Sequence, residues 1–390
     1  MNAEGSNVTR VLVLGAGRVG SAMARDLAAD PAFRTTVVDV SEEALTSLGS
    51  VPDLETGAAD VSDASTLREL LADRDIVVSA VPGPMGFETL RTVLEAGRDI
   101  VDISFFEEDP FQLDELARER GCTAIIDCGI VPGFSNILAG RYERELDPLR
   151  SVRCLCGGVP SVRYWPYEYR ATFSPIDVIA EYTRPARLRR AGRDVVLPAL
   201  SEVEPVEFEG VGTMEAFVTD GLRTLLRTVD AEEMVDKTVR YPGHAERMRL
   251  LRETGYFSEE PVRVDGAEVR PIDLTAELLF EEWRFREGEE DLTVTRVELE
   301  GASDGREVRH TWSSVDRYDR EKGISSMARV TGYTCTAAVR LVAEGRYREP
   351  GISPPEYLGR DAECFEFIVD HLRDRGVDWR HDVSQPMEAA

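Results

Sequence analysis

The sequence predicts an α/β protein: a doubly wound parallel sheet of the Rossmann type, followed by a second α+β domain. Up to about residue 127, short apolar runs alternate with helix-like segments. This alternation favours a parallel sheet with helices on both faces. After about residue 130, strand-like stretches dominate and the regular alternation ends. The length of 390 residues exceeds what one ordinary core holds, which also favours two domains.

Strands and helices alternate through the first part of the chain. The segments expected to be strands are 11–14, 36–39, a short one near 58–61, 76–81, 100–103 and 124–127. The segments expected to be helices are 21–29, 42–48, 65–71, 86–96 and 110–120. In such sheets ligands bind beyond the carboxyl ends of the strands, so we expect a binding site where these strands end.

The second part mixes strand-like and helix-like stretches. Expected strands are 152–157, 169–173, 206–209, 238–241 and a hairpin of 292–299 with 308–314. Expected helices are 175–182, 245–253, 271–280 and 335–344. We predict a Rossmann domain at 1–130, an α+β domain at 131–334, and a helical segment at 335–390 that packs back on the first domain. The tail from about Asp382 is expected to be frayed.

A glycine-rich loop follows the first expected strand and precedes a helix-like segment. Its sequence, Gly15-Ala16-Gly17-Arg18-Val19-Gly20, has the G-x-G-x-x-G spacing of a dinucleotide site. The first glycine permits a tight turn, the second lets backbone amides approach a pyrophosphate, and the third lets the helix pack on the strand. The other interpretation is a glycine turn that binds nothing.

An acidic residue, Asp39, ends the second expected strand about twenty residues after the loop. Its carboxylate would accept hydrogen bonds from the adenosine ribose and repel a 2′-phosphate, so we predict NAD in preference to NADP. The nicotinamide is expected near the end of the strand at 76–81. The predicted cofactor-binding residues are Gly15, Gly17, Arg18, Val19, Gly20, Asp39, Ala80, Val81 and Pro82.

The composition is strongly acidic, with a formal net charge of −27. Lys237 and Lys322 are the only lysines among 46 basic residues, a pattern typical of a high-salt habitat or a high-GC genome. The acidic balance disfavours nucleic-acid binding, which needs a positive patch. The six cysteines form no CxxC pair, so no metal site is expected. No apolar run approaches the length of a membrane helix, and we expect a cytoplasmic protein.

Short motifs along the chain resemble the saccharopine dehydrogenase family. They include Thr238-Val239-Arg240-Tyr241-Pro242-Gly243-His244, Ser79-Ala80-Val81-Pro82, Val101-Asp102-Ile103-Ser104 and Pro132-Gly133. Segments 165–169, 182–187 and 219–223 are most similar to the lysine 6-dehydrogenase branch. The resemblance implies NAD-dependent oxidative deamination of the L-lysine side-chain amine to 2-aminoadipate 6-semialdehyde. The alternatives are a glutamate-forming saccharopine dehydrogenase or reductase, and a non-catalytic NAD-sensing protein.

Two residues are candidates for proton transfer. His244 has an ordinary pKa near neutrality, which suits a proton relay, and the alternative is a structural histidine that caps the next helix. Tyr241 is the other candidate, and strand alternation predicts that it and Arg240 face opposite sides of a sheet. At most one of those two is then expected to touch the substrate.

The remaining candidates would bind an amino-acid substrate. A guanidinium fork suits a carboxylate, so Arg223 is predicted to clamp the α-carboxylate; the alternative is an ion pair with Asp220 or Glu215. Asp127 ends a strand where it could meet an amine or cap a turn. Further arginines, Arg170, Arg184 and Arg187, could serve the additional carboxylates of saccharopine. The resemblance implies that residues 238–241 line the substrate pocket and that the protein is a homo-oligomer, dimeric or higher. Ser104 is a further candidate for substrate binding, near the expected position of the nicotinamide.

Overall fold

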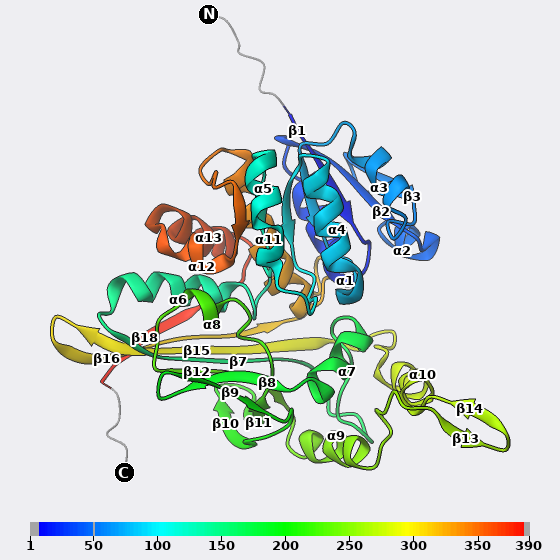
Figure 1. Ribbon diagram of the computed structural model, residues 1–390, viewed down its shortest axis with the longest axis vertical. Coiled ribbons are helices and arrows are strands. Elements are labelled where there is room, and N and C mark those ends of the chain that lie inside the picture. The colour runs from blue at the N-terminus through cyan, green and yellow to red at the C-terminus, as the bar shows by residue number, and fades with distance from the viewer. Residues whose placement is uncertain (1–7, 50, 386–390) are drawn as a thin grey trace, which may run out of the picture. The chain divides into compact units, whose positions relative to one another are not determined.

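The computed structural model describes residues 8–49 and 51–385, and these fold into two compact units (Figure 1). The first unit comprises the described residues up to Arg141 together with Ala328–Gly376. The second comprises Tyr142–Met327 and the described residues from Val377 onward. The chain passes between the units within two helices, α6 (Phe134–Glu145) and α11 (Ser326–Ala343), because each helix begins in one unit and ends in the other.

The first unit is built on a seven-stranded parallel sheet. Its strand order is β17-β6-β5-β4-β1-β2-β3, so β1 lies between β2 and β4, where the order reverses. This is the Rossmann arrangement, and the predicted fold class is confirmed. The strands are β1 (Thr9–Leu14), β2 (Phe33–Asp39), β3 (Leu54–Ala58), β4 (Ile76–Ser79), β5 (Asp99–Asp102), β6 (Thr123–Ile125) and β17 (Gly351–Ser353).

Apolar residues bury both faces of this sheet under helices. On one face, Leu67, Leu90 and Ala117 bring three helices into a core with Leu12 and Val77 of the sheet. These are α3 (Ala64–Leu71), α4 (Gly83–Glu95) and α5 (Asp114–Arg120). The remaining helices of the unit are α1 (Arg18–Ala28), α2 (Glu42–Ser47), the 3-10 turn η1 (Pro110–Leu113), α12 (Pro355–Arg360) and α13 (Ala362–Asp374).

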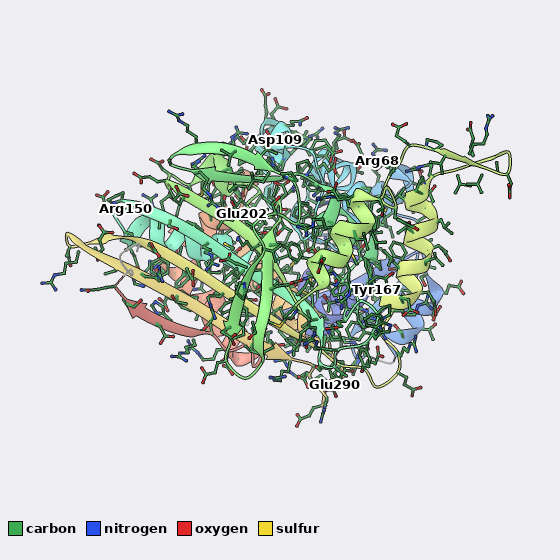
Figure 2. The ribbon with its side chains drawn as sticks, turned by 90° about the horizontal axis from the view of Figure 1, so that it is seen from below. Arg68, Asp109, Arg150, Tyr167, Glu202 and Glu290 are labelled. Atoms are coloured by element: carbon green, nitrogen blue, oxygen red, sulfur yellow. The ribbon has the colours of Figure 1, made fainter. Side chains whose placement is uncertain are left out.

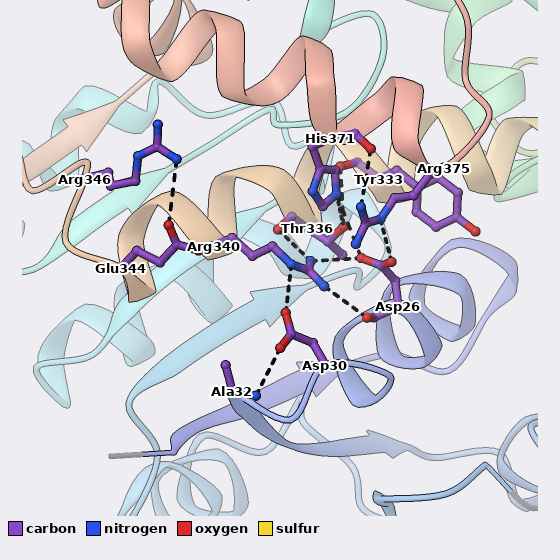
Figure 3. Close-up of polar contacts among 10 residues, drawn as sticks. All are labelled: Asp26, Asp30, Ala32, Tyr333, Thr336, Arg340, Glu344, Arg346, His371 and Arg375. Atoms are coloured by element: carbon purple, nitrogen blue, oxygen red, sulfur yellow. Dashed lines mark hydrogen bonds and ion pairs between the residues drawn. The ribbon is translucent and has the colours of Figure 1, made fainter. Parts of the chain in front are cut away.

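Ion pairs attach the late helices α11 and α13 to α1 (Figure 3). Asp26 of α1 accepts hydrogen bonds from Arg340 of α11 at 2.9 Å and from Arg375, just after α13, at 2.6 Å. Burial alone would raise the pKa of Asp26, but these two guanidinium groups hold it below its ordinary value. His371 of α13 lies 4.0 Å from the same carboxylate. The helix that follows the glycine loop is therefore fixed by residues more than 300 positions away.

The second unit is built on a nine-stranded mixed sheet. Its main path is β10-β11-β12-β7-β15-β16-β18, with β8 paired to β12 and β9 to β8. The pair β7 and β12 is parallel and the other pairs are antiparallel. The strands are β7 (Leu149–Pro160), β8 (Ala186–Arg190), β9 (Arg193–Leu197), β10 (Glu204–Phe208), β11 (Gly212–Val218), β12 (Glu233–Arg240), β15 (Asp291–Ser303), β16 (Arg306–Arg317) and β18 (Arg380–Ser384).

Four helices and a small hairpin complete the second unit. The helices are α7 (Pro175–Thr183), α8 (Leu225–Thr228), α9 (His244–Glu253) and α10 (Pro271–Trp283), and the hairpin joins β13 (Val262–Val264) to β14 (Ala267–Val269). The predicted strand at 169–173 is wrong: Ala171 donates to the carbonyl of Trp283 at the end of α10 and the segment joins no sheet. The expected fraying is wrong for Asp382–Ser384, which pair with β16 in β18, and the rest of that tail from residue 386 lies outside the described residues.

Charged side chains cover the exterior of both units, with Arg150 and Glu202 among those that point outward (Figure 2). Many form ion pairs, such as Arg150 with Glu307 and Arg190 with Glu202, both at 2.9 Å. Exposed pairs of this kind contribute about 1 kcal/mol or less each, so they solvate the surface more than they determine the fold. Within the described ranges, no helix is both long enough and apolar enough to cross a bilayer.

Candidate functional site

The glycine loop between β1 and α1 has the shape that a dinucleotide requires. Gly15 has a φ of +100°, and a Cβ there would lie 2.7 Å from the carbonyl oxygen of Ala80. A Cβ at Gly20 would lie 2.0 Å from the carbonyl oxygen of Gly15. At Gly17, by contrast, a Cβ would meet no atom within 4 Å. The protein itself therefore requires two of the three glycines, and the open space at the third fits an approaching pyrophosphate.

Asp39 ends β2 beside this loop. Its Oδ2 accepts a hydrogen bond from the amide of Ala16 at 2.6 Å, and its Oδ1 accepts one from Ser41 at 2.8 Å. The carboxylate is thus held against the start of α1, whose N-cap, Gly17, has no side chain to accept from the first-turn amides. Such a helix end favours a bound phosphate. The residues present fit a dinucleotide.

The other predicted cofactor residues lie at the same edge of the sheet. Ala80 follows β4, and its amide donates to the carbonyl of Leu14 at 2.9 Å. Val81 is buried, whereas Pro82 is exposed and precedes α4. Arg18 is exposed and Val19 half-buried in the first turn of α1. The structure therefore brings together the ends of β1, β2 and β4, as the sequence predicted.

A buried carboxyl group, Asp102, ends β5 at this edge. Its Oδ1 accepts hydrogen bonds from the hydroxyl of Ser104 at 2.7 Å and from the Ser104 amide at 3.2 Å. Its Oδ2 has no hydrogen-bond partner among the described residues. Burial raises the pKa of Asp102 to about 7, and the nearby Asp127 adds to the effect. Asp127 is itself buried and adopts a left-handed backbone, with a φ of +50°.

In the second unit, one face of the sheet carries polar side chains although it is buried. Strand alternation puts Asp236, Thr238 and Arg240 of β12 on this face, and all three are at least nine-tenths buried. Thr238 is in register with Cys156 of β7, which is in turn in register with Thr295 of β15. A buried sheet face is ordinarily apolar, so a polar one favours a site for a polar ligand.

Arg240 lies at one end of this face. It is 1% exposed, donates to Glu181 of α7 at 2.6 Å, and its guanidinium carbon lies 4.7 Å from the ring centre of Tyr169. Burial raises the pKa of Glu181, although Arg240 opposes this shift. The buried guanidinium thus pairs with a half-buried acid, and the aromatic ring covers the guanidinium. The sequence indicated Arg240 but gave no sign that Glu181 would lie beside it.

Asp236 and Thr238 are linked through one hydroxyl group. Thr219, just beyond β11, donates to Oδ2 of Asp236 at 2.7 Å and lies 3.1 Å from the hydroxyl of Thr238. Burial raises the pKa of Asp236 to about 7. Sequence reasoning missed Asp236 because the strand was expected to begin at Thr238, whereas β12 begins at Glu233 and so puts Asp236 and Thr238 on one face.

His244 and Tyr241 do not have the geometry of a proton relay. His244 is completely buried, its Nδ1 donates to the carbonyl of Tyr167 at 2.9 Å, and its Nε2 lies 2.9 Å from the Tyr182 hydroxyl. Burial, aided by Arg240, lowers the pKa of His244 to about 3, so the ring is neutral and both nitrogens are engaged. This geometry does not support the predicted proton relay, and His244 does not cap α9 as the alternative expected, because the N-cap Gly243 has no side-chain cap bond and both ring nitrogens bond elsewhere.

Tyr241 lies on the sheet face opposite to Arg240. It packs in an apolar cluster with Leu155 and Val159, and its hydroxyl donates to the carbonyl of Pro160 at 2.8 Å. The prediction that the two neighbours face opposite sides is confirmed, and Arg240 is the one on the polar face. The proposed proton transfer through Tyr241 is not supported, since its hydroxyl is used within the core.

Arg223 is buried in the turn after β11 and has a left-handed backbone, with a φ of +51°. The two acids considered as its ion-pair partners also have other contacts. Asp220 accepts two hydrogen bonds from Arg187, at 2.8 and 2.9 Å. Glu215 accepts from the amides of Gly243 and Ala245 at the start of α9, at 2.8 and 2.6 Å.

A dinucleotide loop on a Rossmann sheet, joined to a unit with a buried polar sheet face, defines a nicotinamide-dependent oxidoreductase. Residues 11–125 match the saccharopine dehydrogenase NADP binding domain, and residues 129–377 match the saccharopine dehydrogenase C-terminal domain. The chain belongs to the saccharopine dehydrogenase family, whose enzymes are NAD(P)-dependent oxidoreductases acting on carbon–nitrogen bonds.

Two relatives and one solved structure are distant from this chain in sequence but match it over most of their own length. Saccharopine dehydrogenase [NADP(+), L-glutamate-forming] of Schizosaccharomyces pombe is 19% identical, covering 86% of this chain and 90% of the relative. Carboxyaminopropylagmatine dehydrogenase of Synechocystis is 20% identical, covering 97% and 99%. The solved apo saccharopine dehydrogenase (L-Glu forming) of Saccharomyces cerevisiae is 20% identical with a TM-score of 0.79, covering 96% and 100%, and this match shows the shared fold.

Proposed function

We propose that this protein is an NAD-dependent oxidoreductase of the saccharopine type, which acts on a carbon–nitrogen bond at the side-chain nitrogen of a lysine-derived amino acid. The observation that carries the proposal is the buried polar row of Thr219, Asp236, Thr238 and Arg240, which offers hydroxyl, carboxylate and guanidinium groups to an amino acid. Relatives named saccharopine dehydrogenase support the substrate class.

The protein's part in this reaction is to bind and orient the substrate. The bound nicotinamide coenzyme supplies the hydride acceptor. The reacting amine, with an ordinary pKa of about 10.4, must lose its proton first, and a desolvated site favours its neutral form. Arg240 pairs with Glu181, but its Nε has no hydrogen-bond partner among the described residues, so it would still bind a carboxylate, while Thr238 would supply a hydroxyl. Oxidation leaves a carbon–nitrogen double bond. Water adds to this double bond, and the remaining carbon–nitrogen bond then breaks.

The choice of NAD over NADP rests on Asp39. Its carboxylate lies at the glycine loop and would meet a 2′-phosphate with like charge. Several relatives carry NADP(+) in their names, so the proposed preference for NAD would distinguish this chain from those relatives. We retain the prediction of a homo-oligomer, which light scattering would measure.

Lysine itself is a second candidate substrate, and one observation favours it. Saccharopine carries a glutamate portion whose carboxylates need additional cations. Of the three candidates Arg170, Arg184 and Arg187, Arg170 donates to Glu289 at 3.0 Å and Arg187 forms its two bonds to Asp220. With those guanidinium groups engaged, a substrate with a single carboxylate group is easier to accommodate.

Initial rates with L-saccharopine and L-lysine, each with NAD⁺ and NADP⁺, test the proposal through the absorbance of the reduced coenzyme. We expect turnover of at least one of the two amino acids, with NAD⁺ preferred. Turnover of lysine alone would identify the second candidate. Binding of NADH without oxidation of either amino acid would refute the proposal and favour an NAD-sensing protein.

A further inference from the structure

We infer that Asp236 is the specificity residue that binds the α-ammonium group of the amino-acid substrate. The inference rests on the proposed function and adds the part of the substrate that this residue recognises. Asp236 lies in the middle of β12, a strand buried within the sheet, and is 6% exposed. A carboxylate there is costly unless hydrogen-bond donors or a cation satisfy it.

The two oxygens of Asp236 differ in their surroundings. Oδ2 accepts the hydrogen bond from Thr219, and the turn at Gly221 closes over it so tightly that a Cβ at Gly221 would lie 2.2 Å from Oδ2. Oδ1 is buried and has no hydrogen-bond partner among the described residues. An unsatisfied buried carboxylate oxygen costs about 1–3 kcal/mol or more, so a donor from a ligand would stabilise it.

No cation of the protein serves this oxygen in the described structure. Lys237, the next residue, points to the other face of the sheet and pairs with Glu204. Arg240, on the same face, pairs with Glu181, and Arg187 pairs with Asp220. The charges of Glu181 and Asp220 add to the effect of burial in raising the pKa of Asp236. The surroundings are therefore short of positive charge, which an ammonium group would supply.

The polar neighbours of Asp236 fit an α-amino acid. The turn that covers Oδ2 continues two residues later to Arg223, the predicted clamp for the α-carboxylate. Thr172 and Thr293, each almost fully buried, also have hydroxyl oxygens with no hydrogen-bond partner in the described residues. Thr293 lies on the same sheet face as Asp236 but opposite Gly158 of β7, so it belongs to the Arg240 end of this face and could contact a more distant part of the substrate.

The chemistry separates the two nitrogens of the substrate. The reacting side-chain nitrogen must be neutral to release hydride from its carbon, and a carboxylate beside it would stabilise the protonated form instead. The α-nitrogen takes no part in the reaction and remains a cation. Asp236 therefore suits the α-ammonium group and would hinder the reaction if it held the other nitrogen.

The test compares Asp236→Asn with the wild type on two substrates that differ only in the α-amino group. The partner of lysine is 6-aminohexanoate, which lacks the α-amino group. The partner of saccharopine is 6-aminohexanoate that carries the same dicarboxypropyl group on its nitrogen as saccharopine does. A charged hydrogen bond contributes about 1.5–3 kcal/mol, so we expect kcat/KM for the amino acid to fall about 10- to 100-fold in the variant. We expect kcat/KM for the des-amino partner to change by less than about threefold, which a merely structural role would not produce.

Asp194→Asn is the control. Asp194 is an exposed acid on β9 that pairs with Arg189 of β8, so its replacement should not alter the preference for the amino acid over its des-amino partner. An equal loss on both substrates, or an unchanged preference for the amino acid, would overturn the inference while the proposed function stands. Failure of the wild type to turn over either amino acid would overturn the proposed function and this inference with it. Should Asp236→Asn not fold, Asp236→Glu must lower kcat/KM for the amino acid selectively, and an equal loss there also overturns the inference.

Discussion

Replacement of Asp102 by asparagine should make the protein more stable at neutral and alkaline pH. Asp102 is fully buried at the end of β5, and its pKa is raised from 3.8 to about 7. The folded state therefore holds the proton more tightly than the unfolded state. A group of this kind contributes stability that is fully present below pH 3.8 and is lost as the pH rises through about 7. Asparagine does not ionise and keeps an oxygen that can accept from Ser104.

The size of the effect follows from the shift in pKa. One pKa unit corresponds to about 1.4 kcal/mol, so ionisation of Asp102 costs the folded state about 4 kcal/mol above pH 7. Part of this loss has already occurred at pH 5, where an unfolded aspartate is ionised. Between pH 5 and pH 9 the advantage of Asp102→Asn should grow by about 3 kcal/mol.

Urea unfolding at pH 5, 7 and 9 measures this difference. The control is Asp63→Asn: hydrogen bonds from Ser65 and Thr66 at the start of α3 lower the pKa of Asp63 far below this range. Its carboxylate is ionised in both states throughout, so the effect of that variant should not change with pH. A difference between wild type and Asp102→Asn that stays constant from pH 5 to 9 would refute the reasoning.

Three further predictions test other parts of the structure. Gly17→Ala should weaken NADH binding, measured by fluorescence, at least tenfold without loss of stability, whereas Gly20→Ala should lower the melting temperature because its Cβ overlaps the loop. Burial lowers the pKa of His371 to about 3, so the free energy of unfolding should fall as the pH drops below 6.5, by about 2 kcal/mol at pH 5. His371→Gln should abolish this pH dependence in urea unfolding. Arg240→Met should destabilise the protein to urea by about 1–3 kcal/mol, because it leaves the half-buried Glu181 without its partner.

The first unit was predictable because its signals are local. The apolar run that ends at Leu14, the glycine loop and the acid at Asp39 each follow from neighbouring residues, and the alternation of strand and helix determines the parallel sheet. The strand pairing of β17, which completes this sheet from position 351, lies far along the chain and gave no such signal. Long-range pairing of this kind depends on tertiary structure and not on local pattern.

The substrate side was harder to predict because its residues come together only in the folded sheet. Strand alternation correctly separated Arg240 from Tyr241, but the approach of Glu181 from α7 depends on how that helix packs. His244 looked chemically suited to proton transfer until its burial and its two hydrogen bonds were known. Residue type indicates a possible role, whereas burial and geometry decide whether the group can perform it.

Titration of the protein with NADH and with NADPH, followed by fluorescence at fixed ionic strength, tests the account's central claim most directly. With Asp39 held beside the glycine loop, NADH should bind at least tenfold more tightly than NADPH, and Asp39→Ser should reduce that preference. Tighter binding of NADPH by the wild type, or no binding of either coenzyme, would contradict the account.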